Sequence, residues 1–268
     1  MKKALITGGG GAIAAEIATR LDRRGYRLIL ADINEARMGE VAKRLSHEPV
    51  LVCADLSTAD GVATLSRLIE TEHGDLALLV NNAGYVEPGD IADLTADVID
   101  RHIAINLIAP MQLARIAARL MRARKSGDIL SIVSMGGIVA LKGSASYAAS
   151  KFGLRGFLTS IRSELAGDGV RVMGVFPSGV DTPMLRYEAV HSSGSALNFV
   201  GKVLTAAEVA DACMNALDSG RLETYIPYGD SITSRIIGAF PWLIEKVLPR
   251  FEKAGEKGRA KFRAERGI

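Results

Sequence analysis

Short apolar segments alternate with amphipathic helical segments along most of the chain, and this alternation limits the fold more than any other feature. The strand candidates are KALIT, RLILAD, PVLVCAD, LALLVNNAG, DILSIVSM, VRVMGVFPSG and TYIPYG. Helical periodicity covers the segments between them, at residues 14–23, 35–45, 61–72, 96–123, 147–166 and 206–217. Strands joined by crossover helices predict an α/β fold with a doubly wound parallel sheet. Ligands of such sheets bind at the carboxyl ends of the strands.

The 268 residues, 48% of them hydrophobic, are enough for one domain with a sizeable core. We expect this domain at residues 1–230 and a C-terminal helical extension at residues 231–268. Apolar positions from Ile232 to Phe251 recur at helical spacing around Pro241 and Trp242, and a basic tail follows. Two interpretations compete. The extension covers the substrate pocket or a partner subunit, which we favour, or it lies on a membrane surface with its basic tail near anionic headgroups.

Charge and cysteine content exclude several classes of protein. The net charge is only +3, and the segment from Glu245 onward holds eight Lys or Arg against four Glu, so the main body has no nucleic-acid footprint. Cys53 and Cys213 have neither metal-binding nor redox spacing, and two buried thiols are the simplest interpretation. No metal site is expected. The first apolar strand follows MKK directly and no run of eighteen apolar residues stands out, which favours a cytoplasmic protein.

A glycine-rich turn follows the first strand and opens the first helix. In this context the backbone N–H groups of Gly8, Gly10, Gly11, Ala12 and Ile13 can bind a pyrophosphate. Asp32 closes the second strand, where a carboxylate can bond the adenosine ribose. The two signals in this order predict a Rossmann-type dinucleotide site. The carboxylate of Asp32 would repel a 2′-phosphate, which favours NAD over NADP, although the cation Arg37 follows in the next helix.

Two further strand ends carry residues suited to the same ligand. Asp55 and Leu56 follow the third strand, and Asn82, Ala83 and Gly84 follow the fourth. The carboxyl ends of parallel strands meet at one edge, where the adenine and ribose of a dinucleotide would pass. An ordinary turn explains the NNAG segment about equally well when it is taken alone.

Ser134, Tyr147 and Lys151 are spaced for proton transfer. Tyr147 and Lys151 are four residues apart, so on a helix they share a face. An ammonium about 4–5 Å from a phenolate, at an effective dielectric near 20, is worth roughly 3–4 kcal/mol, or two to three pKa units. We therefore expect Lys151 to bring the pKa of Tyr147 toward the range of a general acid/base near neutral pH.

These motifs, in this order, resemble the short-chain dehydrogenase/reductase family over about residues 3–230. The resemblance rests on the Thr7-Gly8 turn, Asp32, Asp55, NNAG at 81–84, Asn106, Ser134, Tyr147-x-x-x-Lys151, Pro177, Val180 and Thr182. It implies that Tyr147 transfers the proton, that Lys151 lowers its pKa and bonds the nicotinamide ribose, and that Ser134 orients the substrate oxygen. It also implies that Asn106 holds a water in a relay toward Lys151. Pro177, Val180 and Thr182 would then fix the nicotinamide carboxamide.

Three positions depart from the family pattern. Ala12 and Ala14 stand where the family usually has glycine in the phosphate turn, and Ser178 stands directly after Pro177 where glycine is common. The four consecutive glycines at 8–11 give the turn freedom to accommodate the two methyl groups. We expect cofactor binding to survive.

The resemblance implies an NAD(H)-dependent oxidoreductase acting on a secondary alcohol or ketone. A segment at residues 184–204, called the lid below, holds apolar residues that point to a hydrophobic substrate, although packing of the lid on the body explains them equally well. The resemblance also implies a homodimer or homotetramer, because the helices at 96–123 and 147–166 serve as assembly faces in the family. The alternative is a non-catalytic dinucleotide-binding or sensing protein, which would have no use for Asn106, Ser134, Tyr147 and Lys151.

Overall fold

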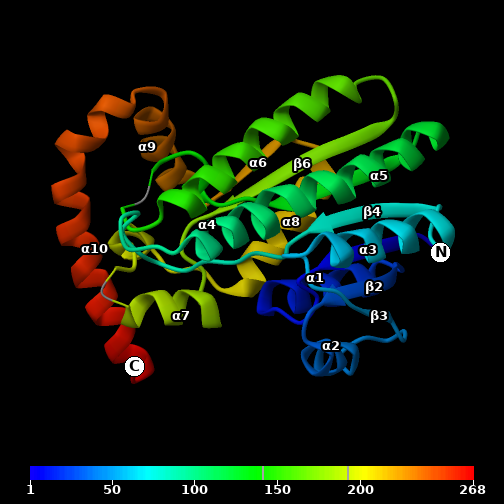
Figure 1. The fold of residues 1–268 in the computed structure, drawn as a ribbon, viewed down its shortest axis with the longest axis horizontal. Coiled ribbons are helices and arrows are strands. Elements are labelled where there is room, and N and C mark those ends of the chain that lie inside the picture. The colour runs from blue at the N-terminus through cyan, green and yellow to red at the C-terminus, as the bar shows by residue number, and fades with distance from the viewer. Residues whose placement is uncertain (141, 192) are drawn as a thin grey trace.

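A seven-stranded parallel sheet runs through the protein in the order β3-β2-β1-β4-β5-β6-β7 (Figure 1). The computed structural model describes residues 1–140, 142–191 and 193–268. The strands are β1 (Lys3–Thr7), β2 (Arg27–Asp32), β3 (Val50–Cys53), β4 (Leu76–Asn81), β5 (Gly127–Ile132), β6 (Val170–Pro177) and β7 (Glu223–Ile226). Every neighbouring pair is parallel. The α/β, doubly wound prediction is confirmed.

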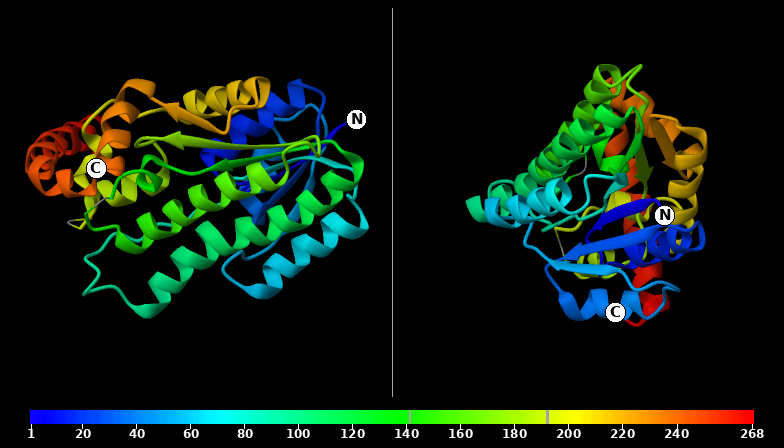
Figure 2. Two further views of the ribbon diagram at one scale, coloured as in Figure 1. Left: turned by 90° about the horizontal axis from the view of Figure 1, so that it is seen from above. Right: turned by 90° about the vertical axis from the view of Figure 1, so that its right-hand side faces the viewer.

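Helices cover both faces of the sheet, as the left view of Figure 2 shows. One face carries α1 (Ala12–Arg23), α2 (Glu35–Ala42) and α8 (Ala206–Ser219), and the other carries α3 (Ala59–Thr71), α5 (Ala109–Arg124) and α6 (Ala145–Glu164). Successive strand residues serve opposite faces: Leu5 packs with α3 and α5, whereas Ile6 packs with α1 and α8. Burial on both faces explains the nearly continuous apolar strands.

The helical stretch from Ala96 to Arg124 is interrupted by a wider turn. It consists of α4 (Ala96–Ile103), the π-helix η1 (Ala104–Ile108) and α5. By length and composition this stretch could cross a membrane, so the expectation that the chain offers no such segment is wrong by that criterion. The same criterion is met by core helices of soluble proteins, and Leu113, Ala117 and Met121 pack in the core beneath α5.

The two cysteines differ in burial. Cys213 on α8 is buried, as expected, but Cys53 is exposed. The expectation of two buried thiols is wrong for Cys53 because it ends β3, the edge strand, which has a neighbour on one side only. No group of three or more His, Cys, Asp or Glu that could hold a metal occurs among the described residues.

The C-terminal extension packs on the lid. The lid contains most of α7 (Pro183–Val190) and the short helix η3 (Ala196–Phe199), and the extension contains α9 (Tyr228–Ala239), η4 (Pro241–Leu243) and α10 (Ile244–Arg266). Gly255 and Gly258 of α10 lie so close to η3 that an added Cβ would collide with its carbonyl oxygens. Phe262 is 3% exposed, and its ring centroid lies 5.2 Å from that of Phe199.

An ion pair and hydrogen bonds from arginines also stabilise the position of α10. Arg266 of α10 pairs with Asp181 at 2.8 Å, and Arg259 donates hydrogen bonds to the carbonyl oxygens of His191 and Gly194 at 3.3 and 3.1 Å. The extension therefore covers the lid from outside (Figure 1). Its other helix, α9, and η4 expose a row of large side chains: Tyr228, Ile232, Ile236, Phe240 and Trp242.

Replacing Phe262 by Ala tests whether α10 holds the lid in place. Truncating a buried Phe costs about 3–5 kcal/mol, and here the loss falls on the contact between α10 and the lid. We expect hydrogen exchange to rise in residues 185–199 and 255–266 while the sheet stays protected. Phe240→Ala, at a 53% exposed position, is the matched control. Unchanged exchange in the lid of Phe262→Ala would contradict this role.

Candidate active site

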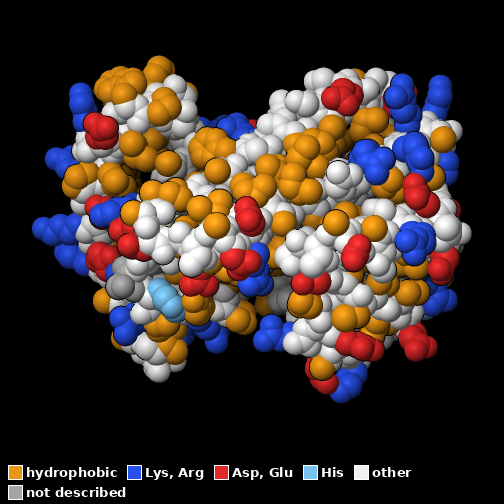
Figure 3. Space-filling model, viewed as in Figure 1, with side chains coloured by type: hydrophobic (Ala, Val, Ile, Leu, Met, Phe, Trp, Pro, Cys, Tyr) orange, Lys and Arg blue, Asp and Glu red, His pale blue; other side chains and the backbone are white. Residues whose placement is uncertain are grey.

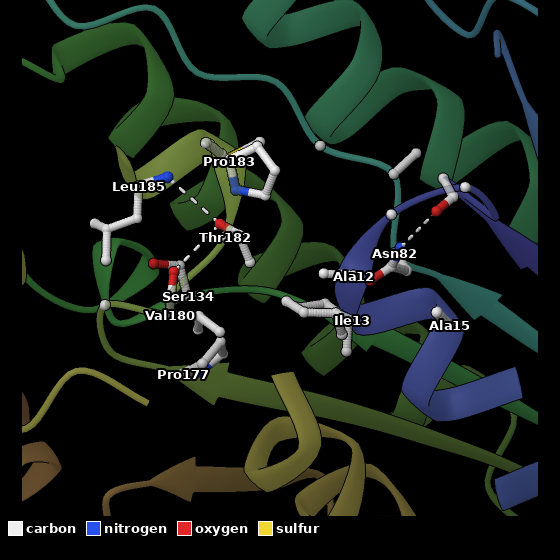
Figure 4. A pocket seen from close by; sticks show the side chains of 18 of the residues that line it. Ala12, Ile13, Ala15, Asn82, Ser134, Pro177, Val180, Thr182, Pro183 and Leu185 are labelled. Atoms are coloured by element: carbon white, nitrogen blue, oxygen red, sulfur yellow. Dashed lines mark hydrogen bonds between the residues drawn. The ribbon is translucent and has the colours of Figure 1, made fainter. Parts of the chain in front are cut away.

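A cavity of about 720 Å³ opens at the carboxyl ends of the strands. This volume lies within the range of about 300–1,000 Å³ common for small-molecule and cofactor sites. Most of the residues expected at the site line it: Gly8, Gly10, Gly11, Ala12, Ile13, Asp32, Asn82, Ala83, Gly84, Ser134, Tyr147, Lys151, Pro177, Val180 and Thr182. Figure 4 shows Ala12 and Ile13 on the opposite side of the cavity from Ser134 and Thr182.

The glycine turn presents backbone at one end of the cavity. Gly8 has φ +64°, and an added Cβ would lie 2.9 Å from Cα of Ala83, so a side chain is excluded there. The N–H of Gly11 donates to the carbonyl of Gly8 at 3.0 Å, which closes the turn. Helix α1 begins at Ala12 without a side-chain cap, so the N–H groups of its first turn remain available to an anion.

The two alanines of the turn are accommodated without crowding it. The methyl group of Ala14 is fully buried in the core cluster beneath α1, away from the cavity. Ala12 is exposed at the first position of the helix and lines the cavity.

Asp32 orients the same turn. One carboxylate oxygen accepts a hydrogen bond from the N–H of Gly10 at 2.9 Å, and the other accepts from the N–H of Asn34 at 2.9 Å. Arg37 and Arg44 line the cavity at this end as well. The guanidinium of Arg44 also pairs with Glu16 at 2.6 Å. Arg44 was not expected at the site, because its position at the end of the predicted helix 35–45 carries no motif.

Asn82 connects the fourth strand to the glycine turn. Its side-chain amide donates to the carbonyl oxygens of Thr7 and Gly8 at 3.0 and 3.3 Å. The hydroxyl of Thr7 accepts in return from the N–H groups of Asn82 and Ala83 at 3.0 and 3.1 Å. The NNAG segment is therefore more than an ordinary turn, since it holds β1 and β4 in register beside the cavity.

Asp55 and Leu56 do not line this cavity. The carboxylate of Asp55 accepts hydrogen bonds from the N–H and hydroxyl of Ser57 at 2.9 and 2.7 Å. These bonds hold the pKa of Asp55 below its usual range. In this structure Asp55 shapes the turn that precedes α3.

Tyr147 and Lys151 meet at the other end of the cavity. Both lie on α6, one turn apart, and the ammonium nitrogen of Lys151 is 5.8 Å from the centroid of the Tyr147 ring. Lys151 is 4% exposed and donates a hydrogen bond to the carbonyl of Ile132 at 3.1 Å. Ser134 follows β5, and its hydroxyl accepts from the N–H of Gly136 at 2.9 Å. The three residues expected to carry proton transfer therefore share one cavity wall.

The expected lowering of the pKa of Tyr147 is not found. Burial raises its pKa to about 12, against the opposing effect of the nearby Ser134 hydroxyl, and the negative charge of Glu188 adds to the rise. Burial likewise lowers the pKa of Lys151 to about 8. The expectation counted the attraction between the two charges at an effective dielectric near 20 and left out the cost of burying them. Here burial disfavours the charged form of both groups, which raises the pKa of the phenol and lowers that of the ammonium.

Asn106 lies behind the cavity wall. It is fully buried on the π-helix, where its amide oxygen accepts from the N–H of Tyr85 at 2.8 Å. Its amide nitrogen donates to the carbonyl of Tyr85 at 2.9 Å and to the hydroxyl of Ser150 at 3.2 Å. These bonds connect the segment after β4 to α6. The water relay toward Lys151 stays a prediction.

Besides Glu40 and Arg44, three more polar residues line the cavity and were not expected from the sequence. They are Ser144, Glu188 and Asn198. Glu188 is 6% exposed, and burial raises its pKa to about 7. One sequence signal could have found Glu188. It follows Leu185 by three residues, so on a helix the two side chains share a face, and Leu185 lines the cavity.

Comparisons with known proteins agree with this geometry. Residues 2–192 match the family model for short chain dehydrogenases. The (+)-borneol dehydrogenase 1 of Salvia officinalis is 31% identical over 223 residues, which are 80% of this chain and 85% of that protein.

Solved structures give the same result. A short-chain dehydrogenase from Sphingobium yanoikuyae in complex with NADPH superposes with a TM-score of 0.78 at 27% identity, covering 91% of this chain and 96% of that one. A bulky-bulky ketone specific alcohol dehydrogenase from Comamonas testosteroni gives 0.76 at 26%, covering 91% and 94%. With its strand order, glycine turn and Ser134, Tyr147 and Lys151 on one cavity wall, the chain belongs to the short-chain dehydrogenase family.

Proposed function

We propose that the protein transfers a hydride between NAD(H) and a hydrophobic secondary alcohol or ketone, with Tyr147 as general acid/base. The observation that carries this proposal is that the cavity joins the glycine turn and Asp32 at one end to Tyr147, Ser134 and Lys151 at the other. One ligand that spans the cavity would place a redox-active ring beside an acid/base pair. A protein that only senses a dinucleotide would need the glycine turn and Asp32 but not Tyr147, Ser134 and Lys151.

The residues present fit a nicotinamide dinucleotide. Backbone N–H groups of the glycine turn and α1 suit its pyrophosphate, and Asp32 suits a ribose hydroxyl. The hydroxyl of Thr182 donates to the carbonyl of Val180 at 3.2 Å and caps α7 by accepting from the N–H of Leu185 at 3.4 Å (Figure 4). This turn would hold the carboxamide end. When bound, the cofactor accepts or supplies the hydride.

The chain's own residues then manage the proton. With a pKa of about 12, the phenol of Tyr147 keeps its proton at neutral pH, which is the form needed to protonate a ketone oxygen during reduction. Alcohol oxidation needs the phenolate instead, so oxidation should speed up as the pH rises. Ser134 would orient the substrate oxygen beside Tyr147. Lys151 would stabilise the phenolate and bond the nicotinamide ribose.

The substrate end supports a bulky hydrophobic substrate. Met184 and Leu185 of the lid line the cavity. Phe199 instead packs with Phe262 of α10, so part of the apolar lid holds the lid on the body. The relatives named for borneol and for bulky ketones support the same substrate class.

Exposed apolar side chains beside α5 and α6 support the family expectation of a homodimer or homotetramer. Ile108 and Phe152 are 44% and 41% exposed beside these helices, where Figure 3 shows hydrophobic side chains gathered. The exposed apolar side chains of α9 and η4 fit the second interpretation, peripheral membrane contact, and the ammonium group of Lys246 on α10 lies over the ring of Trp242 beside them. Both remain proposals.

Tyr147→Phe tests the reaction. We expect it to lower NAD⁺ reduction with borneol, cyclohexanol and 1-phenylethanol by at least about 100-fold, because general acid/base catalysis contributes about 10²–10⁴-fold. NAD⁺ affinity, measured by calorimetry, should change little. Tyr228→Phe, at an exposed tyrosine, is the control. Loss of NAD⁺ binding in Tyr147→Phe would indicate a structural role, and wild-type protein that binds NAD⁺ without oxidising any of the alcohols would favour the sensing alternative.

Asp32→Ser tests the preference for NAD. Removing the carboxylate removes its repulsion of a 2′-phosphate and leaves Arg37 and Arg44 at the same end of the cavity. We expect the ratio of kcat/KM for NADH over NADPH to fall by about 10- to 100-fold, the size of one charge interaction in a partly buried site. The matched control is Asp60→Ser, at an exposed aspartate on α3. A wild-type enzyme that already prefers NADPH would contradict the proposal.

Phe152→Arg tests the assembly face. A charge on an apolar interface disfavours association, so we expect a smaller species than the wild-type oligomer in sedimentation velocity. Phe240→Arg, on the distant exposed face of α9, should keep the wild-type mass. Equal masses for wild type and Phe152→Arg would place the interface elsewhere.

A further inference from the structure

The substrate end of the cavity holds a buried carboxyl group that the proposed hydride transfer does not use. Glu188 lines the cavity from α7 and is 6% exposed. Its Oε2 accepts a hydrogen bond from the side-chain amide of Asn198 at 3.0 Å. Among residues 1–140, 142–191 and 193–268, no hydrogen bond or ion pair reaches its other oxygen, Oε1. One half of this carboxyl group therefore lacks a donor from the described chain.

Within the described part of the chain, no cation pairs with this carboxyl group. Burial raises its pKa to about 7, and the effect that opposes this rise comes from Asn198, an uncharged side chain. The buried carboxylate of Asp22, by contrast, has the ring of His47 as a partner, and the half-buried carboxylate of Asp181 has two arginines. A carboxyl group buried with one uncharged donor and no cation is unfavourable, so at a ligand cavity a donor in the ligand would stabilise it.

A second polar group at the same cavity also lacks a partner. Ser144 is 2% exposed, lines the cavity and has no hydrogen-bond partner for its hydroxyl among the described residues. Tyr147 is close enough for the charge of Glu188 to affect its pKa, which places Glu188 on the catalytic side of the cavity. The substrate end therefore combines apolar walls at Met184 and Leu185 with two polar groups, Glu188 and Ser144, that can still bond a ligand.

Resting on the proposed function, we propose that Glu188, with Ser144 beside the same cavity, forms a subsite for a second polar group of the substrate. The ligand is then a ketone or alcohol with a largely apolar frame that also bears a hydrogen-bond donor, either a hydroxyl or an ammonium group. The donor bonds Oε1 of Glu188 while the reacting oxygen faces Tyr147 and Ser134. Asn198 holds the carboxyl group in position from η3, which α10 covers. A substrate bearing a carboxylate at this place would be repelled.

Three matched ketones test this subsite: 4-methyl-, 4-hydroxy- and 4-aminocyclohexanone. They present the same ring and reacting carbonyl with an apolar, a neutral donor or a cationic group. The measurement is kcat/KM for reduction by NADH, and by NADPH in parallel, expressed as the ratio of each polar ketone to the methyl ketone. We expect the wild-type protein to prefer one or both polar ketones by about 10- to 100-fold, the value of a hydrogen bond to a charged group.

Two substitutions separate charge from hydrogen bonding. Glu188→Gln keeps the shape and an acceptor but removes the charge, so it should abolish a preference for the amino ketone and largely keep one for the hydroxy ketone. Glu188→Leu removes both and should abolish either preference, chiefly through KM. Glu72→Gln, at an exposed glutamate directly after α3, is the control and should keep both ratios. Thermal unfolding and NADH binding of each variant establish that it is folded.

The outcomes are distinguishable. The subsite is supported if the Glu188 variants lose the preference and the Glu72→Gln control keeps it. The polar ketone whose preference is lost identifies the donor group. Equal rates for all three ketones in wild-type protein, or a preference that survives Glu188→Leu, would overturn the subsite and leave the proposed function standing. Failure to reduce any of the three ketones with either nucleotide would instead count against the proposed function, and the subsite would fall with it.

Discussion

The hydrogen bonds between Thr7 and Asn82 join the end of β1 to the segment after β4, and the other parts of the site are arranged around this junction. Strand order reverses between β1 and β4, so the helices that follow these two strands cover opposite faces and leave a crevice at their carboxyl ends. Thr7 is 2% exposed, and its hydroxyl accepts two N–H groups from the segment after β4. This crevice lies between the glycine turn with Asp32 and the cavity wall that carries Ser134, Tyr147 and Lys151.

The sequence predicted the parts of the site that depend on local spacing. Three such parts are the glycine turn between a strand and a helix, the aspartate that closes the next strand, and the tyrosine one turn before a lysine. The geometry of each follows from its spacing, and the structure shows all three around one cavity. The strand order was not predicted, because it depends on which apolar strands pair. Both faces of every inner strand are apolar, and periodicity alone does not distinguish the partners.

Burial accounts for what the sequence did not predict. The pKa of Tyr147 rises because its phenol is desolvated, and no spacing along α6 records how much protein covers that phenol. Glu188 lies in the lid and Ser144 just before α6, both in segments without a motif, and only the folded structure brings them to the same cavity. Asp55 shows the opposite case: its position after a strand suggested a ligand contact, but its two bonds from Ser57 turn it toward the chain.

The contact between α10 and the lid links one wall of the cavity to a part of the chain that is distant in sequence from the other walls. Phe262 packs with Phe199, and Arg259 bonds the carbonyl oxygens of His191 and Gly194, whereas the glycine turn, Tyr147 and Lys151 lie much earlier in the chain. Met184 and Leu185 of the lid line the cavity, so α10 supports that wall from behind. A change in α10 can therefore alter the shape of the cavity without touching any residue on which the proposed hydride transfer depends.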